Sequence, residues 1–117
     1  MPSIRDLVGA IRQRDGVEAA LVLGRDGLLI DSQSAPDVDT EVLAALIPAI
    51  IGPAEELGTA AARGALTTVV LEHASGLAII SVLSADALLV VLARPDANVG
   101  PLLFEIRRNR EHIAALV

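Results

Sequence analysis

The chain has no cysteine, lysine, tryptophan or tyrosine, and Phe104 is its single aromatic residue. Without cysteine it can form no disulfide, thiolate metal site or thiol nucleophile. Without lysine it cannot form a P-loop, in which a lysine reaches the phosphates. The net charge of −6 argues against nucleic-acid binding, which needs clustered positive charge and, for single strands, aromatic side chains on which bases stack.

Aliphatic residues make up most of what remains. Hydrophobic residues are 53% of the 117 positions, which indicates one folded domain over residues 1–117 and excludes a disordered chain. The surplus of apolar side chains over a typical domain suggests that some are left for contact with a partner. The charged N-terminus is unlike a signal peptide, and residues 77–93 are too interrupted to span a membrane, so we expect a cytosolic protein without direct membrane insertion.

The first half of the sequence predicts a helix, a hairpin and a longer helix. Ser3 and Asp6 form a capping-box-like start, and Gly16 marks the end of that first helix. The stretch LVLGRDGLLIDS predicts a hairpin with strands near residues 19–23 and 28–32, because Asp-Gly tolerates the conformations of tight turns. A long helix follows over residues 39–62.

The long helix has a predicted core stripe and two prolines. Each proline removes a backbone donor, so we expect a kink, or two helical pieces that meet near Gly52. The apolar residues at helical spacing are Leu43, Leu46, Ile47, Ile50, Ala54, Leu57 and Ala61.

Three apolar runs follow, over residues 66–72, 77–83 and 88–94. The links between them are too short for parallel crossovers, so they predict an antiparallel meander. Apolar residues from Val99 onward predict a C-terminal helix with Asp96 or Asn98 as its cap. We expect Arg107, Arg108 and Arg110 on its solvent face. The resulting fold class is α+β, a single three-layer domain with a five-stranded antiparallel sheet and helices on both faces.

No group of residues in the sequence predicts catalysis. His73 and His112 each adjoin a glutamate, but adjacent side chains on a strand or helix do not converge on one ligand. The carboxylates have structural roles available in turns and helix caps. We therefore expect no catalytic residue, cofactor or metal site.

Two features instead predict protein contacts. Small or uncharged residues occupy the middle of the long helix face opposite the core stripe, a composition that suits close approach by a partner. The partner-binding candidates are Glu41, Ala45, Pro48, Gly52, Glu55 and Thr59. The flanking line Val42, Ala49, Pro53 and Ala60, together with Leu66, Thr68 and Val70 of an edge strand without deterrent charges, supplies the candidates for a dimer interface.

With these elements in order, the sequence resembles the Roadblock/LC7 family, the dynein-light-chain-like and bacterial gliding-protein-B-like regulators. The resemblance rests on GVEAALVLGRDGLLIDS, LTTVVLEHASGLAIISVL and LLVVLARPDANVGPLLFEIRRN. It implies a roadblock/profilin-like fold and a homodimer paired through residues 66–72, with the helix over residues 39–62 as its binding platform. It also implies binding to a small Ras-like GTPase and modulation of its nucleotide cycle.

The sequence is compatible with three functions. The first is a GTPase regulator, in which Arg25 or Arg63 is a conceivable arginine finger, although we expect help through ordering the partner's own residues. The second is a dimeric scaffold or adaptor that is indifferent to nucleotide. The third is a small-molecule sensor of profilin-like fold, which would need a pocket with a few convergent polar groups.

Overall fold

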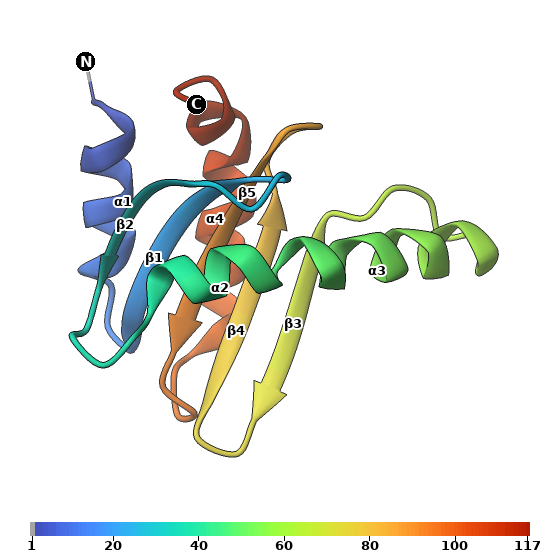
Figure 1. Cartoon of the computed structure of the whole chain (residues 1–117). Coiled ribbons are helices and arrows are strands. Elements are labelled where there is room, and N and C mark those ends of the chain that lie inside the picture. Colours follow the sequence, from blue (N-terminus) through green and yellow to red (C-terminus); the bar gives the residue numbers. More distant parts are fainter. Residues whose placement is uncertain (1) are drawn as a thin grey trace.

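A computed structural model describes residues 2–117, and it contains one five-stranded antiparallel sheet between two helical layers (Figure 1). The strands are β1 (Val17–Gly24), β2 (Leu29–Ser34), β3 (Thr68–His73), β4 (Gly76–Val82) and β5 (Ala87–Ala93), in the spatial order β2-β1-β5-β4-β3. The predicted fold class is confirmed. The last three strands form the predicted meander, and β3 lies at an edge of the sheet.

Four helices cover the two faces of the sheet. They are α1 (Ile4–Arg12), α2 (Thr40–Leu46), α3 (Pro48–Ala60) and α4 (Val99–Ala114). Helices α1 and α4 pack on one face, against a cluster that includes Val22, Leu89 and Val91. Helices α2 and α3 pack on the other face, against Leu21, Leu88 and Val90. Because successive strand residues point to opposite faces, the central strands are apolar at almost every position.

The local signals in the sequence account for most helix ends. Ser3 and Asp6 make the predicted capping box, with hydrogen bonds in both directions between side chain and backbone. Asp39 caps α2, because its Oδ1 accepts a hydrogen bond from the Val42 amide at 3.2 Å. Asn98 occupies the N-cap position of α4 but makes no side-chain hydrogen bond there.

The long helix divides at Ile47, not near Gly52 as predicted. Ile47 ends α2 and precedes Pro48, which is the first residue of α3. A proline is tolerated at that position because the first amides of a helix have no intrahelical acceptor. Pro53 lies inside α3, and the helix continues through it to Ala60.

The predicted core stripe of this helix is wrong at Leu46, Leu57 and Ala61, which are all exposed; Ala61 lies just past the end of α3. The side chains that face the sheet belong to Ala44, Ile47 and Ile51, so Leu46 lies about 100° away from Ile47 around the helix axis. Leu57 is 68% exposed because the C-terminal half of α3 extends past β3, beyond the edge of the sheet (Figure 1). After Ile51, no residue of α3 is buried.

Arg110 also departs from the predicted solvent face. Its guanidinium donates to Ser81 Oγ and to Thr68 Oγ1, the latter at 3.1 Å, and to the Thr67 carbonyl at 3.3 Å. Ser81 is fully buried, and Arg110 gives its hydroxyl a partner. Arg110 thereby ties α4 to the edge strand β3, whereas Arg107 and Arg108 are exposed as predicted.

The sheet-facing position of Ile51 leads to a stability prediction. We expect Ile51→Ala to lower the free energy of unfolding by about 2 to 5 kcal/mol, because the buried side chain leaves a cavity against the sheet. Leu28→Ala, at a hairpin residue that is 68% exposed, should change it by less than about 0.5 kcal/mol. Urea unfolding of the two variants checks this, and equal losses would contradict the assigned burial.

Candidate protein-interaction surface

Helices α2 and α3 carry an exposed apolar surface. Val42, Leu46 and Leu57 are each more than half exposed, although all three are large aliphatic residues. Isolated exposed aliphatic residues are normal, but several on one helical segment mark an interaction surface. We call the outward side of α2 and α3 the helical surface.

The residues predicted for partner binding lie on this surface. Glu41, Ala45, Gly52 and Thr59 are exposed, while Pro48 and Glu55 are partly buried. Gly52 has open space around its Cα, since a Cβ placed there meets nothing within 4 Å. The predicted dimer residues of the same helices, Val42, Ala49, Pro53 and Ala60, are likewise exposed. The structure thus leaves both predicted sets accessible.

Strand β3 divides the other predicted dimer residues between two faces. Thr68 and Val70 pair with Ser81 and Ile79, whose side chains lie on the α4 face of the sheet. Leu66 packs instead with the cluster under α2 and α3. Val69 and Leu71, which the sequence prediction did not single out, are the β3 side chains on the face of α3. Their alternation with Thr68 and Val70 along the strand is the signal that could have identified them.

An ion pair fixes the hairpin tip to α3. Arg25 Nη1 donates to Glu55 Oε1 at 2.9 Å, and Arg25 Nη2 donates to Glu55 Oε2 at 3.3 Å. The hydrogen bonds from Arg25 hold the pKa of Glu55 below its ordinary value of 4.5. The backbone amide of Arg25 also donates to the Asp86 carbonyl at 3.0 Å. Arg25 is therefore engaged within the chain, whereas Arg63 is exposed and forms no ion pair with any described residue.

By length and composition alone, the segment Thr40–Ala60 could also cross a membrane. Its mean hydropathy is 1.4, and 17% of the apolar window is buried. One such helix is weak evidence for a span. Ala44, Ile47 and Ile51 hold this segment against the sheet, so its remaining apolar side chains form the outer surface of a packed layer.

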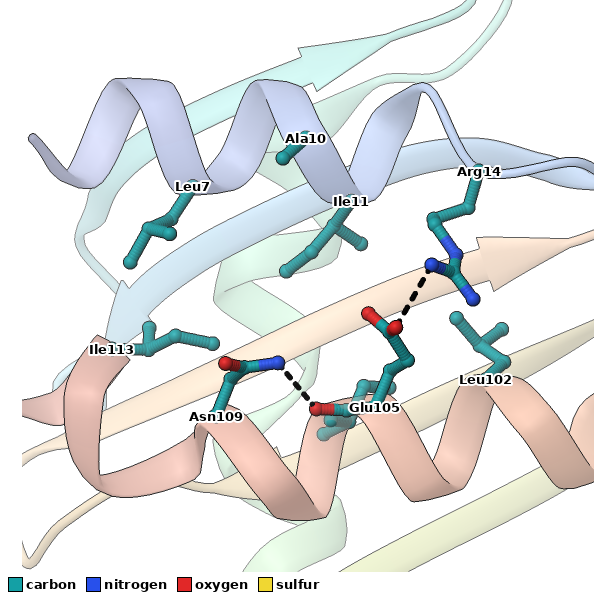
Figure 2. A pocket seen from close by; sticks show the side chains of 9 residues that line it. Leu7, Ala10, Ile11, Arg14, Leu102, Glu105, Asn109 and Ile113 are labelled. Carbon is teal, nitrogen blue, oxygen red and sulfur yellow. Dashed lines mark hydrogen bonds and ion pairs between the residues drawn. The ribbon is translucent and has the colours of Figure 1, made fainter. Parts of the chain in front are cut away.

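A groove between α1 and α4 lies on the opposite face of the sheet (Figure 2). It has a volume of about 160 Å³, close to that of a cavity that holds one benzene molecule. Its walls are mostly aliphatic, with Leu7, Ile11 and Ile113 among them. Its polar residues are already satisfied: Arg14 pairs with Glu105 at 3.0 Å, and Asn109 Nδ2 donates to the Glu105 carbonyl at 2.9 Å. No convergent set of unpaired polar groups of the kind that orients a small-molecule ligand lines it.

The described part of the chain, residues 2–117, holds no group of three or more histidine and acidic residues that could bind a metal ion. His73 lies at the end of β3 and His112 on the exposed side of α4.

Comparisons with known proteins agree with this architecture. The Roadblock/LC7 domain of Streptomyces avermitilis is 22% identical, with a TM-score of 0.86 over 97% of each chain. MglB of Myxococcus xanthus is 16% identical, with a TM-score of 0.87 over 97% of this chain and 93% of that one. The protein MJ1340 of Methanocaldococcus jannaschii is 30% identical over 91% of this chain and 92% of its own length. These likenesses define a roadblock-type α+β protein.

The family model named Roadblock/LC7 domain matches residues 4–93. The chain belongs to the Roadblock/LC7 family, as the resemblance of its hairpin and meander segments indicated. The match covers both edge strands, β2 and β3, and the whole of α2 and α3, which carry the helical surface.

The Arg25–Glu55 ion pair gives a pH-dependent prediction. Because the folded-state pKa of Glu55 is lowered, the pair stabilises the fold above pH 4.5, and this stabilisation is lost as pH falls through the lower folded-state value. We expect Glu55→Gln to be less stable than the unmodified chain at neutral pH and to converge with it in acid. Urea unfolding across this pH range measures the difference.

Glu56→Gln is the matched control, because Glu56 is the exposed neighbour and forms no ion pair with any described residue. Its stability should run parallel to that of the unmodified chain throughout. A constant difference between Glu55→Gln and the unmodified chain at every pH would show that the ion pair does not form in solution.

Proposed function

We propose that this chain is a homodimeric, non-enzymatic regulator of a small Ras-like GTPase that acts in the cytoplasm. The observation that carries the proposal is the projection of α3 beyond β3 (Figure 1). The C-terminal half of α3 leaves Leu57 exposed, and it does so beside an open sheet edge. A second copy supplies cover for both features at once.

The dimer forms through the edge strand β3. Edge strands present unpaired amides and carbonyls, and β3 carries neither lysine nor proline to deter pairing. Antiparallel pairing of two β3 strands about a two-fold axis joins two five-stranded sheets into one. It also brings the two α3 helices side by side, where Leu57, Pro53 and Ala60 pack against the second copy.

The helical surface of the dimer is the site for the GTPase. Family membership supports this partner, since the resemblance to gliding-protein-B-like regulators implies binding to a small GTPase. The surface offers small side chains at Ala45 and Gly52, so a partner's backbone can come close. Arg25 is held by Glu55, which argues against it as an arginine finger, whereas Arg63 is exposed. In this proposal the regulator stimulates or steers hydrolysis by ordering the partner's own residues.

A nucleotide-independent scaffold is the second candidate. It uses the same dimer and the same helical surface, and it differs only in binding the GDP and GTP states equally. The sensor hypothesis has less support, because the polar groups of the α1–α4 groove pair with one another.

Dimerisation is tested by a charge placed on each sheet edge. We expect Val70→Arg in β3 to weaken the dimer by roughly thirtyfold or more, because it brings two like charges together at the two-fold axis. Ile30→Arg in β2 is the matched control: Ile30 is 46% exposed and Val70 45%, and both lie on edge strands. Sedimentation equilibrium measures both variants. A dimer broken by Ile30→Arg and kept by Val70→Arg would exclude pairing through β3.

Partner binding is tested by affinity capture from lysate in GDP or a non-hydrolysable GTP analogue. We expect a small GTPase to be retained mainly with the analogue, and Ala45→Arg to abolish its retention while sedimentation still shows the dimer. Ala74→Arg, at an exposed alanine in the β3–β4 turn, should retain it. Retention that ignores the nucleotide would favour the scaffold, and retention by Ala45→Arg would move the site off the helical surface.

A further inference from the structure

The single aromatic side chain of this protein lies on its surface. Phe104 is in α4 and is 63% exposed. A phenylalanine left in water forgoes the stabilisation that burial of its ring would give, and aromatic residues are enriched at protein interfaces. Phe104 takes no part in the core of the domain, which is aliphatic.

Two unpaired arginines lie about one helical turn after Phe104. Arg107 and Arg108 follow Phe104 by three and four residues, so all three lie on the outer side of α4, one turn apart. Both arginines are exposed, and within residues 2–117 no side chain forms an ion pair with either. We call Phe104, Arg107 and Arg108 the α4 patch.

The nearby carboxylates leave this positive charge available. Glu105 is engaged by Arg14 across the α1–α4 groove, at 3.0 Å (Figure 2). Glu111 is one turn further along α4 and forms no ion pair with either arginine. A local excess of positive charge therefore surrounds the exposed ring, in a chain whose net charge is −6.

We propose that the α4 patch docks an acidic segment of a partner protein, with an apolar side chain of that segment against Phe104. Arginine binds carboxylates in a bidentate manner, and arginine and aromatic residues are typical of the few side chains that dominate an interface. The patch lies on the sheet face opposite the helical surface (Figure 1). It can therefore be occupied together with the GTPase site.

The charge pattern favours a protein segment over a bilayer. Binding to anionic membranes takes clusters of about four to eight basic residues, and this patch has two. The remainder of the chain carries excess negative charge, which an anionic bilayer repels. A short segment reaches the patch without bringing its own charge near that remainder.

The test uses fluorescence anisotropy of a labelled peptide built of Glu, Leu and Ala, with the full chain as the binding protein. We expect the unmodified chain to bind this peptide at low salt, with affinity falling as ionic strength rises. Phe104→Ser and the double variant Arg107→Gln/Arg108→Gln should each weaken binding by about tenfold or more. The unmodified chain should bind a peptide with Gln in place of Glu no more tightly than these variants bind the Glu peptide.

Matched controls separate the patch from general effects. Leu28→Ser removes an apolar side chain of similar exposure, and Arg63→Gln removes an exposed, unpaired arginine elsewhere. Both should bind the Glu peptide as the unmodified chain does.

Four results would overturn the proposal. The unmodified chain could fail to bind the Glu peptide, or could bind the Gln peptide equally well. Phosphatidylserine vesicles could be bound through Phe104 in place of the peptide, which would assign the patch to a bilayer. Sedimentation could show self-association that Arg107→Gln/Arg108→Gln abolishes, which would assign it to another copy of this chain.

Discussion

The structure depends on burying β5 on both faces. Leu88, Leu89, Val90 and Val91 are consecutive and fully buried, so their side chains need apolar cover on both sides of the sheet. Helices α1 and α4 supply that cover on one side, and α2 and α3 on the other. The three-layer arrangement follows from this requirement, since a strand apolar at every position cannot face water.

The same arrangement leaves a deficit at the β3 edge. The segment of α2 and α3 runs across the sheet and past β3 (Figure 1), so its buried residues lie in its first part. Past Ile51 no residue of α3 is buried, and within residues 2–117 β3 has no strand on its outer side. The exposed end of α3 and the open edge of β3 lie side by side, so one symmetric contact with a second copy would cover both.

The two sheet faces carry surfaces of different chemistry. The helical surface on α2 and α3 carries small and aliphatic side chains and a few glutamates, which suits close packing against another backbone. The α4 patch on the other side combines one aromatic ring with two unpaired cations, which suits recognition of carboxylates. Arg110 belongs to neither surface, because it hydrogen-bonds the hydroxyls of Ser81 and Thr68 and so contributes to the fold itself.

The helices and strands, the antiparallel meander of β3 to β5 and the edge position of β3 could all be predicted from the sequence. Strand periodicity, the short links after β3 and β4, and the capping box at Ser3 are local signals, and local chemistry is enough to interpret them. Which side of the long helix meets the sheet depends on tertiary packing, because Leu46 and Leu57 share the helical spacing of Ile47 but lie outside the contact. Tertiary packing also partly buries Arg110, whereas Arg107 and Arg108 stay exposed. Three arginines of one helix read alike in sequence, and the hydroxyl that engages one of them comes from a strand 29 residues earlier.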